Sequence, residues 1–247
     1  MCAPKKPKTG LYLNSTNMSY YSEHEKFHVA VDSIIFGYDE EGRELKVLLL
    51  KRNFQPAKGE WSLMGGFLKN NEGVDEAAKR ILNQLTGLSD VYMEQLYTFG
   101  ELDRDPGARI ISVAYFALIK INASDLELVR THGATWIPIS AMPQLIFDHS
   151  AMVDRALKKL QIRARTQPIG FELLPDKFTI PQLQGLYEAI YNKTLDKRNF
   201  RRKLLSMDLL EKLEEKEKES SRKGAWYYRF DANKYEDLLK RGFNFEL

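Results

Sequence analysis

Hydrophobic and polar positions alternate from Phe27 onward and then become continuously apolar. The pattern breaks at an acidic, glycine-containing turn at residues 39–43 and resumes with the apolar run 46–50. Two half-buried or buried strands joined by a tight turn produce this pattern, so a β-hairpin is predicted. A loop with Pro and Gly at residues 53–60 then leads into one short strand at residues 61–68.

In the next segment apolar residues recur at helical spacing, so a helix is predicted to begin near Val74. It is predicted to end at Gly87, because glycine suits the left-handed conformation of the residue that closes a helix. At about 100° per residue one stripe is apolar and the opposite face polar. The apolar stripe holds Ala78, Ile81, Leu82 and Leu85; the polar face holds Glu76, Lys79, Arg80 and Asn83. This is the pattern of an ordinary amphipathic helix, and Glu72 could pair with Arg80 to tie the preceding loop to it.

Two strand-like stretches follow, separated by the charged loop 103–107. Residues 110–121 are rich in β-branched and aromatic side chains and are expected to form a central strand. A polar interval, a strand at residues 134–139 and a helix from His149 to about Ile162 complete this half. Strands interleaved with helices predict an α/β fold.

Pro168, Gly170 and Pro175 mark residues 167–174 as a joint between two domains. Beyond it, Thr179 is expected to cap a helix with Pro181 in its first turn. That helix turns Leu183, Leu186, Tyr187 and Ile190 to one face.

A second helix, capped by Asp196, should carry Phe200, Leu204 and Met207 on its packed face and Arg198, Arg201 and Arg202 opposite. A strand, a polar tip and the strand 225–230 follow. The order helix, helix, strand, turn, strand is that of a winged helix-turn-helix. The side chains predicted to contact double-stranded DNA are Lys197, Arg198, Asn199, Arg201, Arg202, Lys203 and, at the hairpin tip, Arg222 and Lys223.

Composition sets limits on the class of protein. The chain of 247 residues is 43% hydrophobic and 29% charged, which is typical of a globular protein, and no apolar run approaches the length of a bilayer span. Cys2 is the single cysteine, so an internal disulfide and a cysteine metal site are excluded and a reducing, cytoplasmic location is expected. The net charge is only +3. However, six basic residues lie between residues 193 and 203 against one aspartate, which suggests a polyanionic partner.

Gly66, Glu72, Arg80, Leu82, Gly87 and Leu88 have the spacing of the Nudix signature box, and residues 27–160 resemble the Nudix sandwich element by element. Where that family has three catalytic glutamates, this chain has Ile81, Gln84 and Leu85. Magnesium requires carboxylate oxygens that these residues cannot supply. The resemblance therefore implies a Nudix scaffold without its metal, catalytic residues or cofactor.

Polar and aromatic residues near the altered box are candidates for binding a small effector: Trp61, Glu72, Glu101, Asp103, Arg104 and Arg109. Carboxylates are prominent among them, which favours a neutral sugar over an anionic ligand. We expect His149 to cap or pack its helix rather than bind a ligand, and Asp148 to be the N-cap.

Residues 27–247 as a whole resemble bacterial transcriptional regulators that join a Nudix-like sensor to a winged helix, and are close to arabinose-responsive members from Bacteroidetes. The fold class implied is a Nudix-like α/β/α sandwich followed by a winged helix-turn-helix domain. The expected division is a tail (1–26), a sensing domain (27–165) and a DNA-binding domain (166–247). The resemblance implies a homodimeric repressor or activator of carbohydrate utilisation that binds operator DNA, with DNA binding modulated by a sugar such as L-arabinose. The alternative is a pyrophosphatase for ADP-ribose or a nucleotide sugar, or an ADP-ribose-sensing regulator.

Overall fold

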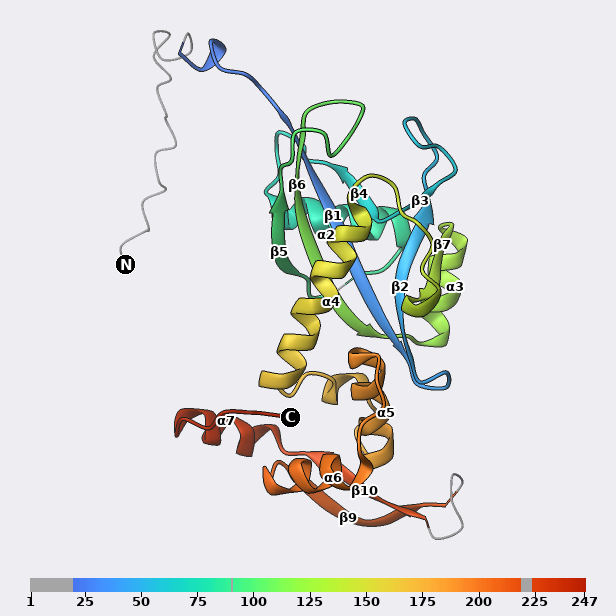
Figure 1. Ribbon diagram of the computed structural model, residues 1–247, viewed down its shortest axis with the longest axis vertical. Helices are drawn as coiled ribbons and strands as arrows, with labels where there is room; N and C mark the ends of the chain where they lie inside the picture. Colours follow the sequence, from blue (N-terminus) through green and yellow to red (C-terminus); the bar gives the residue numbers. More distant parts are fainter. Residues whose placement is uncertain (1–19, 90, 219–223) are drawn as a thin grey trace, which may run out of the picture.

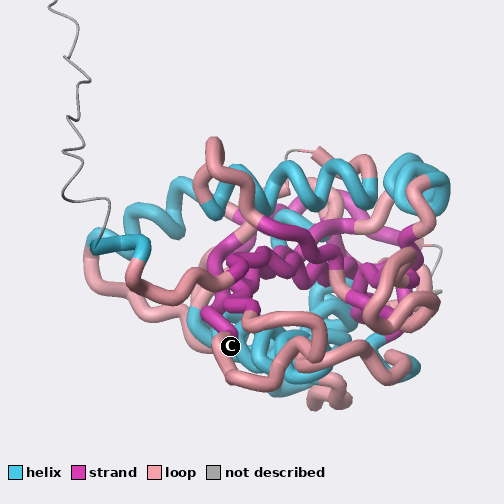
Figure 2. The backbone as a smooth tube through the Cα atoms, turned by 90° about the horizontal axis from the view of Figure 1, so that it is seen from above, coloured by secondary structure: helices cyan, strands magenta, loops and turns pink. Residues whose placement is uncertain are grey.

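The computed structural model describes residues 20–89, 91–218 and 224–247. Its first part is a seven-stranded mixed sheet with helices on both faces, and its second part lies at one end of that sheet (Figures 1 and 2). The strands of the large sheet are β1 (His28–Asp39), β2 (Glu44–Lys51), β3 (Trp61–Ser62), β4 (Met64–Phe67), β5 (Glu94–Phe99), β6 (Ile110–Lys120) and β7 (Ala134–Pro138).

The predicted hairpin is confirmed as β1 and β2, which pair antiparallel with Phe36 opposite Val47. The central strand is confirmed as β6, which runs parallel to β1 and antiparallel to β5. The single strand expected at residues 61–68 is instead two: β3 pairs with β2, and β4 pairs with β1. The two strands can pair with different partners because the chain changes direction at Leu63.

β1 divides the core between the two faces of the sheet. Ile34, Phe36 and Tyr38 lie in the cluster with helix α4 (His149–Thr166), whereas Val31 and Ile35 lie in the clusters on the opposite side. This is the two-residue alternation of a strand with both faces covered. Helix α2 (Val74–Thr86) lies over that opposite face and packs on β4 and β1.

Helix α2 matches its prediction at both ends. Ala78, Ile81 and Leu82 are buried and Leu85 is half-buried. Gly87 closes the helix in the left-handed region, with φ of 75°. A residue with a side chain would be strained there and would also collide with Leu128.

One helix replaces the polar interval expected at residues 122–133. This is α3 (Ala123–Thr131), capped by Asn122, whose side chain accepts a hydrogen bond from the Asp125 N–H. Val129 is its one buried residue, so the sequence carries almost no helical hydrophobic pattern there. Helix α4 also continues to Thr166, four residues past the predicted end.

The second part has the predicted order of a winged helix. It consists of β8 (Phe178–Thr179), α5 (Ile180–Tyr191), α6 (Lys197–Ser206), β9 (Leu210–Glu217), β10 (Ala225–Phe230) and α7 (Ala232–Lys240), with strand order β8-β10-β9. The capping box is confirmed: the Gln182 N–H donates to Thr179 Oγ1, and the Thr179 N–H donates to Gln182 Oε1 at 2.7 Å. Helix α7 was not predicted, and none of its residues is buried.

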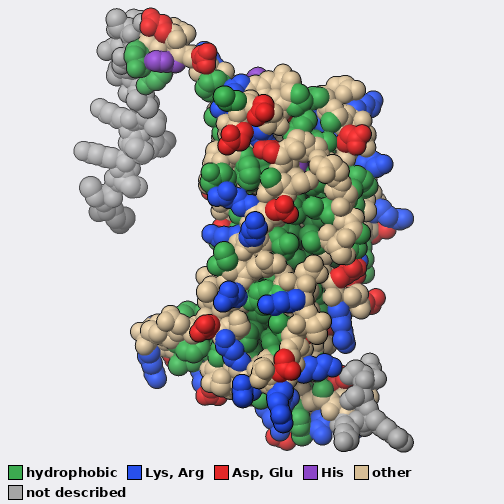
Figure 3. All heavy atoms as spheres, viewed as in Figure 1, with side chains coloured by type: hydrophobic (Ala, Val, Ile, Leu, Met, Phe, Trp, Pro, Cys, Tyr) green, Lys and Arg blue, Asp and Glu red, His purple; other side chains and the backbone are tan. Residues whose placement is uncertain are grey.

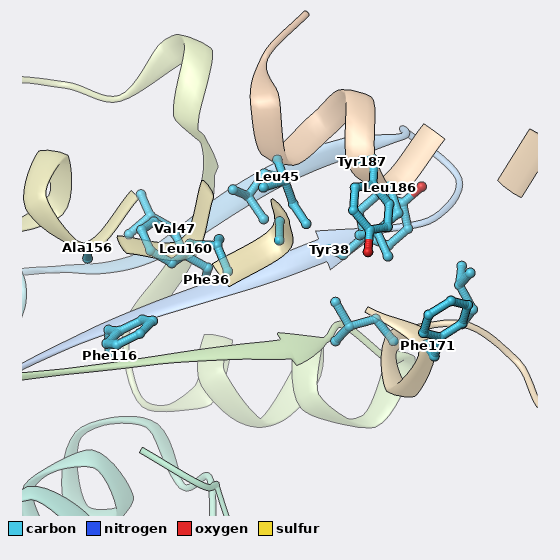
Figure 4. Close-up of a cluster of buried hydrophobic side chains, with 14 of the residues drawn as sticks. Phe36, Tyr38, Leu45, Val47, Phe116, Ala156, Leu160, Phe171, Leu186 and Tyr187 are labelled. Atoms are coloured by element: carbon cyan, nitrogen blue, oxygen red, sulfur yellow. The ribbon is translucent and has the colours of Figure 1, made fainter. Parts of the chain in front are cut away.

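A single hydrophobic cluster runs through both parts (Figure 4). Tyr38 and Leu45 of the first hairpin lie with Leu186 and Tyr187 of α5, and all four are buried. Gln182 also donates to Glu40 at 3.0 Å across the junction. The boundary expected between residues 165 and 166 stays a prediction, and the two parts are packed together rather than joined only by a linker. No helix in the described part of the chain has both the length and the apolar character needed to cross a bilayer.

Candidate effector and DNA-binding sites

The loop before α2 is held to the helix by Glu72 and Arg80, as expected. Arg80 Nε donates to Glu72 Oε2 at 2.7 Å, and Nη2 lies 2.5 Å from Oε1. This paired charge holds the pKa of Glu72 at about 2, and the Lys69 N–H adds a further hydrogen bond to the carboxylate. Arg80 Nη2 also donates to the carbonyl of Phe67, so one guanidinium joins β4, the loop and the helix. Glu72 is already neutralised within the protein.

The positions of the three glutamates do not fit a magnesium ion. Ile81 is buried, and its side chain lies against Gly66, where an added Cβ would approach Ile81 Cδ1 to 3.1 Å. Gln84 accepts a hydrogen bond from Arg80, and Leu85 packs against the apolar clusters. Within the ranges described, no three His, Cys, Asp or Glu side chains come together to hold a metal ion. Since Mg²⁺ is bound through hard oxygen ligands, this donor set does not suit it.

A buried polar network links β1, the loop after β5 and the start of α4. Arg104 donates to Asp148 through Nε (2.9 Å) and Nη2 (2.8 Å), and Nη2 lies 3.7 Å from Asp32 Oδ2. Asp32 also accepts from Ser112 Oγ at 2.5 Å. The Arg104 side chain is 3% exposed and Asp32 is 7% exposed. Arg104 thus lies against two carboxylates and joins segments 44 and 72 residues away in the chain.

His149 lies beside this network and is packed, as predicted. The Leu63 N–H donates to His149 Nδ1 at 3.2 Å, and Nε2 lies 3.7 Å from Asp32. Burial lowers the pKa of His149 despite the nearby aspartate, so the ring is neutral at pH 7. Asp148 occupies the N-cap position, but its side chain makes no hydrogen bond to the helix and instead binds Arg104. The expectation that it caps the helix is therefore only half right.

Arg52 was missed in the sequence, although it lies next to this network. Its guanidinium carbon is 3.9 Å from the centre of the Phe54 ring and 5.4 Å from that of Phe147. Its Nε is buried without a hydrogen-bond partner in the structure, and burial lowers its pKa, opposed by Asp105 and Asp32. Phe54 is 52% exposed. A cation beside two aromatic rings, with one N–H that has no hydrogen-bond partner, is suited to an anionic ligand that also carries a ring.

The six candidate effector residues occupy different surroundings. Arg104 is buried in the network and Glu72 is paired with Arg80. Arg109 donates to the Glu101 carbonyl at 2.9 Å, which is the one hydrogen bond joining two of the six in the described residues. Trp61 is half-buried with Lys51 over its ring, and the side chains of Glu101 and Asp103 are exposed. Their roles in binding stay predictions.

The outward face of α6 is strongly basic. Phe200 and Leu204 are buried and Met207 is half-buried, as predicted, and Asp196 caps the helix by accepting from the Asn199 N–H at 2.8 Å. The exposed residues are Lys197, Arg198, Asn199, Arg201, Arg202 and Lys203. In the space-filling view, Lys and Arg side chains are numerous over this end of the molecule (Figure 3).

The β9–β10 hairpin lies beside α6 in the place of a wing. Trp226 is flanked by Lys212 (3.8 Å) and Lys216 (4.4 Å), and Arg201 Nη2 lies 3.5 Å from the buried Tyr228 hydroxyl. Arg201 is therefore oriented towards the wing, whereas the expectation grouped it with Arg198 and Arg202. Arg222 and Lys223, predicted at the hairpin tip, lie outside the described residues.

Two family matches divide the chain in the same order as its structure. Residues 26–156 match the Nudix domain, and residues 170–230 match the NrtR DNA-binding winged helix domain. The crystal structure of Shewanella oneidensis NrtR complexed with a 27mer DNA is similar over 82% of this chain and 93% of its own, with 30% identity and a TM-score of 0.66. The chain belongs to the NrtR family.

One further relative and a second structure of Shewanella oneidensis NrtR are also similar to this chain. The ADPR-responsive transcriptional repressor NtrR of Acinetobacter baylyi is 29% identical over 90% of this chain and 91% of its own length. The Nudix domain of Shewanella oneidensis NrtR complexed with ADP ribose covers 60% of this chain and 99% of its own, at 28% identity and a TM-score of 0.50. The predicted fold, a Nudix domain followed by a winged helix, is confirmed. These relatives do not support the narrower expectation of an arabinose-responsive regulator.

Proposed function

We propose that this protein is a transcriptional repressor that binds operator DNA through α6 and the wing and responds to ADP-ribose through its Nudix domain. The observation that carries the proposal is the exposed basic face of α6 on a winged helix of the NrtR type. The similarity to an ADPR-responsive repressor along nearly the whole chain supports the same function. Guanidinium groups such as Arg198 and Arg202 suit both phosphates and guanine edges. A homodimer on a two-fold symmetric operator is part of this proposal.

ADP-ribose is preferred to a free sugar for a physical reason as well. The case for a sugar rested on the carboxylates of Glu72, Glu101 and Asp103; Arg80 pairs with Glu72, whereas Glu101 and Asp103 are exposed. Arg52, which was not among the candidate residues, has its guanidinium beside both Phe54 and Phe147, and its buried Nε has no hydrogen-bond partner in the structure. A cation beside aromatic rings suits the diphosphate and adenine of ADP-ribose better than the hydroxyls of arabinose.

We further propose that the protein binds ADP-ribose without hydrolysing it. Ile81, Gln84 and Leu85 provide no carboxylate, and Ile81 packs against Gly66 where a metal ligand would be needed. The test is release of AMP and ribose 5-phosphate from ADP-ribose with and without magnesium. Magnesium-dependent turnover that disappears in Glu72→Gln would refute this part of the proposal.

The junction between the two parts supplies a physical route between effector and DNA. Gly185 of α5 lies against the first hairpin, where an added Cβ would lie 3.5 Å from the Tyr38 hydroxyl and 3.6 Å from Arg43 Cδ. Gln182 binds Glu40 there. A shift of this hairpin would move α5, and with it the α6 that packs on it, because the contacts are close-packed and not hinged.

Fluorescence anisotropy of the full chain with a DNA duplex tests this function. The duplex is first selected from a random pool by its binding to the full chain. At fixed salt, ADP-ribose should weaken DNA binding by about 5 to 150-fold, the usual size of such coupling. L-Arabinose should leave the curve unchanged. A response to arabinose but not to ADP-ribose would keep the regulator and overturn the effector; a response to neither would overturn the sensing role.

A further inference from the structure

A cavity of about 680 Å³ lies where α4 meets α5 and α6, away from the altered box. Its walls come from both parts of the molecule: α4, the two helices of the winged helix, the turn between them and the C-terminal segment. The volume lies within the range of small-molecule sites, about 300 to 1,000 Å³. Its lining shares no residue with the proposed ADP-ribose site, and shares Asn199 and Lys203 with the predicted DNA-contacting residues of α6.

Four cations surround the cavity: Lys158, Arg165, Lys193 and Lys203. All are exposed, and none has an ion-pair partner within 4 Å among the residues that the structure describes. The single Asp or Glu side chain in its lining is Asp196, which already accepts the Asn199 N–H as the cap of α6, and Leu247 adds the terminal carboxylate of the described chain. Four cations outnumber these two anions, so the field in the cavity favours an anionic ligand.

The walls of the cavity are aromatic and aliphatic. Tyr187, Tyr191 and Phe200 lie along it, with Ile162, which is 61% exposed, and Leu195 beside them. The Tyr191 hydroxyl is buried and has no hydrogen-bond partner in the structure. A buried polar group without a partner costs stability, so a ligand that accepts this O–H would gain a hydrogen bond that the free protein lacks.

The cavity borders the DNA-reading side of α6. At 100° per residue, Asn199 and Lys203 lie roughly 100° to 140° around the helix from Arg198, but Asn199 lies only about 60° from Arg202. Arg202 Nη2 donates to Asn199 Oδ1 at 3.0 Å, so an occupant would contact α6 beside the Arg202 guanidinium, with Arg198 farther around the helix. It would also contact α4, and so would fix the winged helix relative to the Nudix domain.

We propose that this cavity is a second effector site, which takes an anion with an aromatic body, such as an aryl phosphate. The cations hold the anionic group, Tyr191 donates its hydroxyl hydrogen, and the aromatic walls cover the ring. This second site does not depend on which ligand the Nudix domain binds, because it shares no residue with the proposed ADP-ribose site.

The test is a calorimetric titration of the full chain with 1-naphthyl phosphate, with inorganic phosphate and neutral 1-naphthol as the two partial ligands. Lys193→Glu reverses one exposed charge in the wall, and Tyr191→Phe removes only the hydroxyl. Lys26→Glu is the matched control, an exposed and unpaired lysine of the described chain near the start of β1. Thermal melts of each variant verify that it is folded.

We expect 1-naphthyl phosphate to bind at least tenfold more weakly to Lys193→Glu and at least threefold more weakly to Tyr191→Phe, with Lys26→Glu within twofold of the parent. Each partial ligand should bind at least tenfold more weakly than 1-naphthyl phosphate. Equal binding to the parent and Lys193→Glu would overturn the site. Equal affinity of the parent protein for inorganic phosphate and for 1-naphthyl phosphate would also overturn the site, because it would show a general attraction for anions. Displacement of 1-naphthyl phosphate by ADP-ribose, together with unchanged binding to Tyr191→Phe, would overturn it as well.

Discussion

Replacing Arg104 by Met is expected to destabilise the protein strongly, because it removes the common partner of two carboxylates. Arg104 contacts Asp148 at 2.8 and 2.9 Å, its side chain is 3% exposed, and Asp32 is 7% exposed. Breaking a buried ion pair on one side costs about 3 to 5 kcal/mol. Asp148 is 20% exposed and can regain some hydration, and Asp32 keeps its bond from Ser112, so we expect a loss near the lower limit, about 3 kcal/mol.

Arg130→Met provides the matched control. Arg130 Nη2 donates to both oxygens of Glu127, at 3.0 and 2.9 Å, but the two side chains are 77% and 62% exposed. Exposed pairs contribute about 0 to 1 kcal/mol, so the same substitution should cost much less here. Urea unfolding followed by far-ultraviolet circular dichroism measures both losses, with the slopes compared to verify that the same surface is exposed.

The comparison also decides what Arg104 does. If its main role is to pair with Asp148 and Asp32 inside the protein, folded Arg104→Met should bind ADP-ribose with an affinity close to that of the parent protein. A loss of stability within 1 kcal/mol of that in Arg130→Met, together with a large loss of ADP-ribose affinity, would refute the reasoning and would return Arg104 to the effector-binding residues.

Three further predictions concern separate parts of the molecule. Arg80 lowers the folded-state pKa of Glu72 from 4.5 to about 2. The difference in stability between the parent and Glu72→Gln should therefore be full above pH 4.5 and disappear as the pH falls towards 2. Urea unfolding at a series of pH values measures this difference. Arg198→Ala and Arg202→Ala should each weaken DNA binding by about 1 to 3 kcal/mol if the side chain reads a base, and should reduce the salt slope if it contacts only phosphate; unchanged anisotropy curves for both would contradict the role of α6. Thr179→Ala should lower the free energy of unfolding by about 1 kcal/mol through loss of the α5 cap, whereas an unchanged midpoint would show that the cap is dispensable.

Local pattern was enough to predict the elements whose burial follows a regular period. The alternation of β1, the stripe of α2 and the capping box at Thr179 all depend on residues within a few positions of one another. Helices α3 and α7 lack such a pattern, since one buries only Val129 and the other buries none of its residues. Both begin at a capping side chain, Asn122 or Asp231, which was the local signal available.

The candidate site was less predictable because its contacts join distant segments. Arg104 meets Asp148 and Asp32 only after the sheet and α4 are assembled, so the sequence could not show that these three residues form one network. Arg52 was overlooked for the same reason, since Phe147, which contacts it, lies 95 residues away. Its neighbour Phe54 was the one local hint of a cation beside a ring.

The central claim is that ADP-ribose and operator DNA bind to one protein in linked equilibria. The most direct measurement is the dissociation constant of ADP-ribose, by calorimetry at fixed salt, for the free protein and for the protein saturated with its selected duplex. Linkage requires DNA to weaken ADP-ribose binding by the same factor by which ADP-ribose weakens DNA binding, about 5 to 150-fold. Equal dissociation constants in the two titrations would contradict the account.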